Sequence, residues 1–171
     1  MLSIFKKKVE IFKDNAEILR EKSTDVLDAK EAVKICSILK DAFPGSEKCV
    51  GLAANQVGIA KKCFYVNFNS FEEFFINTEI TGQSKQTQSN MEGCLSLPGL
   101  NAFVVRPRFI NVRYRDKDFV LKEMEYGNFL ACIIQHEFDH TNGIMFIDKV
   151  SNGEFKKVRR QLKEREIQAI R

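Results

Sequence analysis

The sequence predicts an α+β fold in which antiparallel β-sheets surround a central helix and a further helix follows at the C-terminus. Three patterns within the 171 residues support this prediction. Apolar and polar residues alternate between positions 62 and 126, as in strands that bury one face. Residues 128–141 are apolar on nearly every side, which favours a buried helix. Residues 153–171 carry a partial apolar stripe among basic residues, which favours an exposed helix.

The first predicted element is a helix over residues 28–43. Asp28 followed by Glu31 is the capping-box pattern with which many helices begin. Pro44 and Gly45 are expected to end the helix. Apolar residues recur at helical spacing between these limits, and they are Ile35, Ile38, Leu39, Ala42 and Phe43.

The middle of the chain predicts strands near residues 64–68, 74–80 and 110–114. Phe119 and Leu121 follow a polar turn and are assigned to a further strand. We expect these strands to pair in antiparallel fashion. Residues 81–90 are polar and show no apolar period, so they are predicted to form a loop.

The two C-terminal helices differ in their expected roles. The helix over residues 128–141 is bounded by Asn142 and Gly143, a pair suited to a left-handed C-terminal cap, and it offers a rigid scaffold for a site. The chain has a net charge of +4, and residues 154–171 hold 7 basic against 3 acidic residues, while the rest of the chain holds 20 of each. The basic helix at about 153–171 therefore carries the whole charge excess.

Composition excludes several classes of protein. The length suits one domain over residues 1–171. The longest apolar run, residues 129–134, is far shorter than the roughly 20 residues of a membrane span. The N-terminal sequence does not match a secretory signal, so we expect a cytoplasmic protein. Five cysteines without a C-x-x-C pair predict reduced thiols. Neither a membrane nor DNA is expected as a partner.

The segment from His136 to His140 is the most informative, because it contains both histidines of the chain with Glu137 directly after the first. Residues four apart on a helix lie one above the other, so the two imidazoles can bind one metal ion. Glu137 points about 100° away and can reach a metal-bound water. The alternative is two histidines packed in a helix, which would leave Glu137 and Asp139 desolvated without compensation.

Two histidines leave the site incomplete, since catalytic zinc-like centres use three protein ligands and an open position. Cys94 is the best candidate for the third ligand, although a free cysteine can also be a small buried apolar residue. A third segment, residues 51–56, has small residues that let backbone lie against a ligand, followed by Gln56, whose amide can donate to developing negative charge. It can also be a turn that enters a strand.

These three segments, in this order, resemble the motifs of the peptide deformylase family, which run G-x-G-x-A-A-x-Q, E-G-C-L-S and Q-H-E-x-D-H. They stand here at residues 49–56, 92–96 and 135–140, and the resemblance extends over most of residues 10–150. It implies an α+β catalytic domain that hydrolyses the N-formyl group from new polypeptides that begin with formylmethionine, releasing formate. It also implies one divalent metal ion, Fe(II) in the cell, which zinc, nickel or cobalt can replace.

The resemblance also assigns roles to residues of this chain. Cys94, His136 and His140 are expected to hold the ion, and the bound water is expected to act as nucleophile with Glu137 as general base and then acid. The backbone N–H of Leu95, together with Gln56, is expected to stabilise the oxyanion. Charged residues expected to orient the ligands are Glu92, Arg106 and Asp139. The methionine pocket and substrate backbone are expected to meet Val50, Gly51, Phe129, Cys132 and Ile133.

Two positions depart from the family pattern. Cys49 stands where the first motif has glycine, and Asn101 stands where many relatives have arginine, so we expect the rim of the cleft to differ. Neither change touches the expected ligands.

Other functions and roles remain open from the sequence. A zinc endopeptidase shares the H-E-x-x-H pattern but should have its third ligand downstream. A structural metal module could use its basic tail on nucleic acid. The basic helix at 153–171 is either a solvated face or a site that docks on ribosomal RNA, as in family members.

Overall fold

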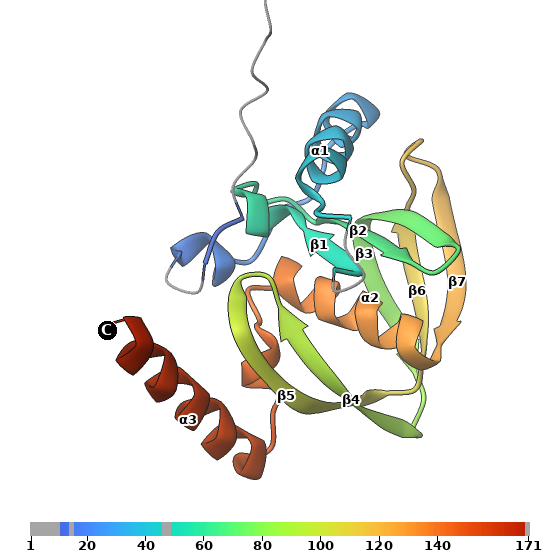
Figure 1. Ribbon diagram of the computed structural model, residues 1–171. Helices are drawn as coiled ribbons and strands as arrows, with labels where there is room; N and C mark the ends of the chain where they lie inside the picture. Colours follow the sequence, from blue (N-terminus) through green and yellow to red (C-terminus); the bar gives the residue numbers. More distant parts are fainter. Residues whose placement is uncertain (1–10, 14–15, 46–48, 170–171) are drawn as a thin grey trace, which may run out of the picture.

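The computed structural model describes residues 11–13, 16–45 and 49–169 (Figure 1). The N-terminal stretch considered above for a secretory signal lies outside these residues, as do the last two residues of the predicted C-terminal helix. The described residues form three α-helices, which are α1 (Ala29–Ala42), α2 (Asn128–Thr141) and α3 (Asn152–Ala169), with short 3₁₀ turns η1 (Glu17–Leu19), η2 (Ala54–Val57) and η3 (Phe146–Asp148).

Seven strands of the described part of the chain form two antiparallel sheets. A five-stranded sheet has the order β1-β2-β3-β6-β7, and a long ribbon is made of β4 and β5. Helix α2 lies between the sheet and the ribbon (Figure 1), so the predicted α+β fold with sheets around a central helix is confirmed. The strands are β1 (Gly51–Ala53), β2 (Cys63–Phe68), β3 (Phe71–Gln83), β4 (Thr87–Cys94), β5 (Leu97–Pro107), β6 (Phe109–Arg115) and β7 (Leu121–Gly127).

Helix α1 begins as its sequence predicts. The Asp28 carboxylate accepts a hydrogen bond from the backbone N–H of Glu31 at 2.9 Å, and the Glu31 carboxylate accepts one from the N–H of Leu27 at 2.8 Å. Such a reciprocal cap satisfies two donors that a helix start otherwise leaves open. The buried face of α1 then packs on the sheet through Ile35 and Leu39.

Helix α2 is buried on most sides, which explains why its sequence is apolar nearly all round. It contacts β1, β2, β4, β5, β6 and β7. Its end follows the predicted cap, because Gly143 adopts φ +73° and donates its N–H to the His140 carbonyl at 3.1 Å. A Cβ on Gly143 would lie 2.4 Å from the Arg20 carbonyl oxygen, so glycine is needed for both conformation and space.

The predicted loop at residues 81–90 is wrong. Strand β3 continues to Gln83, and β4 begins at Thr87 and pairs with β5, with Thr87 opposite Pro107 and Asn90 opposite Val104. The apolar alternation is missing because the inward face of β4 is polar. Gln88, for example, donates to the Asn128 carbonyl at 2.6 Å rather than packing in an apolar core.

One smaller expectation differs from the structure and one agrees with it. Phe119 lies in the turn before β7 with φ +63°, and the strand itself begins at Leu121. The basic helix is present as α3, where Val158 is buried while Lys156, Lys157 and Arg159 are exposed. Among the helices of the described residues, none combines the length and apolar character that a membrane span requires.

Candidate metal centre

Three side chains predicted as metal ligands come together in the structure. His136 and His140 project from one side of α2, and Cys94 is the last residue of β4. One ligand atom from each of the three lies within 4.8 Å of the others, and the Cys94 sulfur is 3.3 Å from Nε2 of His140. Such a cluster of one thiol and two imidazoles can bind a divalent transition metal. The predicted trio is therefore confirmed.

The surroundings of the two imidazoles fit a cation. Burial of His140 lowers its pKa well below the usual value, which keeps its ring in the neutral form that binds metals. Burial also opposes charge on His136, yet hydrogen bonding to Cys94 and Glu92 raises its pKa to about 10. Nδ1 of His136 lies 2.8 Å from Glu92, which leaves Nε2 for an ion. The contacts that favour a proton on this ring also favour a bound cation.

Glu92, Arg106 and Asp139 form a buried charge network behind His136. Arg106 donates to both Glu92 oxygens at 2.5 and 2.9 Å and to Asp139 at 2.8 Å. Burial alone would raise the pKa of Glu92, but its hydrogen bonds from His136 and Arg106 hold that pKa at about 2. The carboxylate therefore stays ionised and fixes the orientation of the His136 ring.

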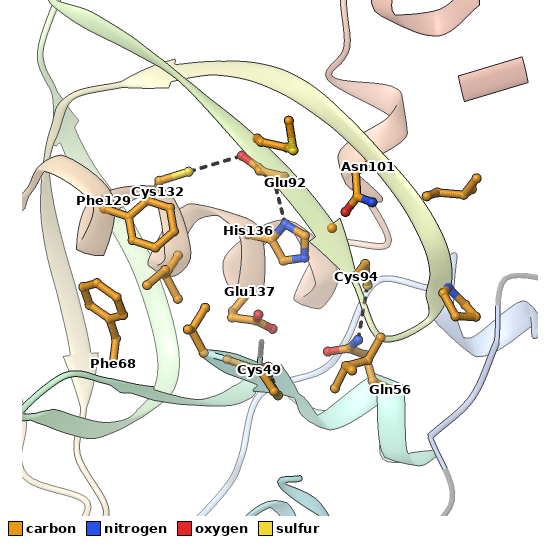
Figure 2. Close-up of a pocket in the computed structure, with 18 of the residues that line it drawn as sticks. Cys49, Gln56, Phe68, Glu92, Cys94, Asn101, Phe129, Cys132, His136 and Glu137 are labelled. Atoms are coloured by element: carbon orange, nitrogen blue, oxygen red, sulfur yellow. Dashed lines mark hydrogen bonds and ion pairs between the residues drawn. The ribbon is translucent and has the colours of Figure 1, made fainter. Parts of the chain in front are cut away.

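Gln56 reaches the same centre from η2. Its Oε1 accepts the backbone N–H of Ala53 at 2.9 Å, which leaves the amide nitrogen as the end that faces the site. This nitrogen donates to Ser96 Oγ at 3.1 Å and lies 3.4 Å from the Cys94 sulfur (Figure 2). The sequence reasoning gave no role to Ser96, although it lies in the same short motif as Cys94.

Glu137 lies on α2 between the two histidines and faces β1 rather than their side of the helix. Its carboxylate is almost fully buried, and among the described residues its Oε2 has no hydrogen-bond partner. A Cβ on Gly51 would lie 2.5 Å from the other carboxylate oxygen, so glycine at this position gives Glu137 its space. Burial raises the pKa of Glu137 to about 7, a value suited to giving and taking protons near neutral pH.

A cavity of about 610 Å³ opens in front of these groups (Figure 2). Most of the predicted site residues line this cavity. They are Val50, Gly51, Gln56, Glu92, Cys94, Leu95, Phe129, Cys132, Ile133, His136 and Glu137. Phe68 and Phe129 lie at one end, 5.2 Å apart between ring centres. An apolar end beside a polar centre is typical of small-molecule and peptide sites.

Three predicted residues do not line this cavity. His140 is a buried member of the trio, and Arg106 and Asp139 line a second cavity of about 480 Å³. The lining residues that the sequence did not identify include Phe68 and Met91. No local signal identifies them, because their position depends on how strands distant in sequence are arranged around α2.

The two departures from the family pattern both lie in this cavity. Cys49 is 5% exposed, and its thiol donates to the Gly51 carbonyl at 3.5 Å. Burial raises its pKa to about 12, so the thiol stays protonated and uncharged. Asn101 is exposed and stands at the rim across from Gly93 on the neighbouring strand. The rim therefore carries neutral side chains at both positions.

The arrangement as a whole suits metal-assisted hydrolysis. Three ligands would leave a cation an open position, a carboxylate with a raised pKa lies in the same cavity, and an amide donor lies beside the Cys94 sulfur. The apolar end of the cavity can bind one side chain of a substrate.

Comparisons with known proteins agree on one family. The family model described as polypeptide deformylase matches residues 8–156. A peptide deformylase of Prochlorococcus marinus strain NATL1A is 36% identical over 176 residues, which cover 95% of this chain and 85% of that protein. Among solved structures, a peptide deformylase from Plasmodium falciparum has a TM-score of 0.84 at 34% identity, covering 94% of this chain and 98% of that one. One from Legionella pneumophila has a TM-score of 0.83 at 27% identity, covering 96% and 99%.

Proposed function

The chain belongs to the peptide deformylase family and is a metallo-hydrolase, and we propose that Glu137, Gln56 and Leu95 carry out the chemistry on formylated peptides beside the metal trio. The substrate class implied by the family is the formylated nascent peptide. The observation that supports this assignment best is the convergence of one thiol and two imidazoles at the mouth of a cavity that also holds a buried carboxylate.

Cys94, His136 and His140 would hold one divalent cation, and we propose Fe(II) in the cell with zinc, nickel or cobalt as substitutes. The donor set supports a transition metal, because a thiolate and imidazoles bind such ions in preference to magnesium or calcium. When bound, the cation supplies Lewis-acid activation of water. Glu92 would keep the His136 ring in the tautomer that presents Nε2 to the ion.

Glu137 would move the proton. Its buried carboxylate, with a pKa near neutrality and an unpartnered Oε2, can accept a proton from the attacking water. It can then donate that proton to the departing amine nitrogen, which leaves as the N-terminus of the peptide. Burial keeps other proton donors and acceptors away from this oxygen.

Gln56 and the backbone N–H of Leu95 would stabilise the oxyanion that forms at the formyl carbon. The Gln56 amide nitrogen lies 3.4 Å from the Cys94 sulfur, and Leu95 follows Cys94 directly and lines the cavity. A backbone N–H and a side-chain amide held by hydrogen bonds are already in place, so they need not reorganise when the negative charge develops. The position of both donors beside the metal ligand Cys94 supports this role.

The methionine side chain would enter the apolar end of the cavity. Phe129, Cys132 and Ile133 line that end from α2, and Val50 and Gly51 line it from the β1 side, where we expect them to meet the peptide. A flexible thioether fits an irregular apolar pocket well. We propose residues 1–171 as one catalytic domain. One apolar cluster joins α1 to the five-stranded sheet, a second joins that sheet to α2, and a third joins β5 to Val158 of α3.

The direct test is formate release. The metal-loaded protein, incubated with formyl-Met-Ala-Ser and with the unformylated peptide, is expected to release formate from the first and to leave both peptide chains intact. Cleavage of internal peptide bonds would instead indicate an endopeptidase. Absence of formate from protein that contains one equivalent of iron or nickel would refute the proposed function.

We also propose that α3 docks the enzyme on the ribosome, in the cytoplasm where nascent chains emerge. Exposed Lys156, Arg159 and Lys163 give α3 a basic surface, and contacts to phosphate depend steeply on salt. The variant K156E/R159E/K163E is expected to lose salt-sensitive co-sedimentation with ribosomes. The matched control is K30E/K34E on α1, which changes exposed lysines elsewhere. Equal binding by both variants would exclude this docking surface.

A further inference from the structure

One face of the β4–β5 ribbon is exposed and apolar. The antiparallel register places Met91 opposite Phe103 and Ser89 opposite Val105, with all four side chains on the same face. Met91 is 59% exposed, Phe103 45% and Val105 62%. The outward face of an antiparallel ribbon is usually polar, because the other face supplies the burial. We call Met91, Phe103 and Val105 the apolar strip.

The apolar strip is continuous with the catalytic cavity. Met91 lines the cavity, together with Gly93 and Asn101, which form the next pair on the same face of the ribbon. The metal ligand Cys94 follows Gly93 on the same strand. The strip therefore starts at the mouth of the cavity and leads away from the metal trio toward Val105.

The ribbon holds the apolar strip in place before anything binds. On its inner face Ala102 and Val104 pack in the core, and the Phe103 backbone N–H donates to a Glu154 carboxylate oxygen of α3 at 3.1 Å. Because the surface is already formed, little conformational entropy is lost when a partner binds. No charged side chain lies on this face between the pairs Ser89–Val105 and Gly93–Asn101. It therefore favours an uncharged, apolar partner.

We propose that the apolar strip binds the third to fifth residues of the formylated peptide and gives the enzyme a preference for apolar side chains there. This inference rests on the proposed function. A peptide whose first side chain occupies the cavity must leave by its mouth, where Met91 stands. An extended chain advances about 3.3 Å per residue, so three residues span roughly the distance from Met91 past Phe103 to Val105. The occupant is thus the substrate chain itself.

The test compares formyl-Met-Ala-Leu-Phe-Leu with formyl-Met-Ala-Ser-Ser-Ser on the metal-loaded enzyme. We expect kcat/KM to be about tenfold higher for the apolar peptide, a size typical of partial burial of one or two apolar side chains. The difference should appear in KM with similar kcat, because the strip is remote from the reacting bond. The readout is the ratio of the two kcat/KM values.

The variant Phe103→Ser/Val105→Thr should reduce this ratio to about one, while Phe103→Leu should retain it. The control Met124→Ser changes an exposed methionine on β7, 52% exposed, and should leave the ratio unchanged. Thermal unfolding of each variant checks that it folds.

Four outcomes overturn the inference. A wild-type ratio of about one excludes the preference, and a ratio that survives in the double variant places it elsewhere. If the double variant keeps the ratio but no longer forms a dimer that the wild type forms in analytical ultracentrifugation, the strip would be an interface between two copies. Failure to release formate from any peptide, including formyl-Met-Ala, would overturn the proposed function as well.

Discussion

At Glu137, burial and reactivity depend on the same contacts. The carboxylate sits against Gly51 with one oxygen unpartnered, and desolvation raises its pKa to about 7. Burying an ionised carboxylate lowers the stability of the folded protein. Such a loss of stability is common at functional sites. The position was recognised from sequence because the spacing of the two histidines on a helix is a local pattern.

Glu137→Gln tests the proton-transfer role. The variant should bind one equivalent of metal, because Glu137 contributes no atom to the trio, yet kcat should fall by roughly 10²–10⁴-fold. The amide has nearly the same shape but cannot exchange the proton. Metal analysis and formate release on the same sample provide the measurement. Wild-type turnover in the metal-loaded variant would remove Glu137 from the mechanism.

Glu92 gives a prediction about acid stability. Its folded pKa of about 2 lies below the ordinary 4.5, so its contribution to stability is present above pH 4.5 and is lost as the pH falls toward 2. The shift corresponds to roughly 3 kcal/mol in total. The difference in unfolding free energy between metal-free wild type and Glu92→Gln should shrink by roughly 2 kcal/mol from about pH 6 to about pH 3.

Urea titrations of both proteins at several pH values measure this difference. A gap that stays constant with pH would show that Glu92 is not held ionised by Arg106 and His136.

At the scale of the elements, the end of α2 matters for the metal ligands. Gly143 accepts φ +73° and leaves room for the Arg20 carbonyl, and its N–H caps the carbonyl of His140. The cap therefore ties the last turn of the helix, which bears a ligand, to the segment before α1. This link was visible in the sequence only as the pair Asn142 and Gly143.

Gly143→Ala should destabilise the protein by roughly 1–3 kcal/mol, because the added Cβ meets backbone and the conformation is strained for alanine. The matched control is Gly153→Ala in α3, where the new Cβ would have only Ser151 Oγ at 3.8 Å, so stability should hold or rise slightly. Denaturant unfolding of both variants compares them. Equal stability of the two would contradict the packing assigned to Gly143.

The elements also show where sequence reasoning succeeds and where it fails. The capped helix α1 and the buried helix α2 were predicted because their signals are local. Strand β4 was missed because its inward face carries polar residues, of which Gln88 and Glu92 bond to polar groups rather than to an apolar core. Period-two reasoning detects strands only when one face is apolar.

At the scale of the whole molecule, the site is assembled from segments distant in sequence. The trio could be predicted because two ligands are local and the third stands in a short motif. Part of the cavity wall could not, since Phe68 and Met91 reach it only through the placement of the sheet and the ribbon around α2. The orienting role expected for Arg106 agrees with its hydrogen bonds to Glu92, whose carboxylate lies 2.8 Å from Nδ1 of His136.

Because the ligands join α2 to the ribbon, metal binding should stabilise the whole fold. A ligand that binds only the folded state adds about 4 kcal/mol when its concentration is about a thousand times Kd. Chelation should therefore lower Tm by several degrees, and restored nickel or zinc should recover it. Cys94→Ser should lose most of this metal-dependent shift. An identical Tm with and without metal would argue that the ion does not bridge these elements.

The location of the ion tests the central claim most directly. Crystals of the metal-loaded protein, measured at the absorption edge of nickel or iron, should show one anomalous peak bonded to the Cys94 sulfur and to nitrogens of His136 and His140. The remaining coordination position should face the cavity and Glu137. A peak bonded to other residues, or a fourth position occupied by another protein side chain, would contradict the account.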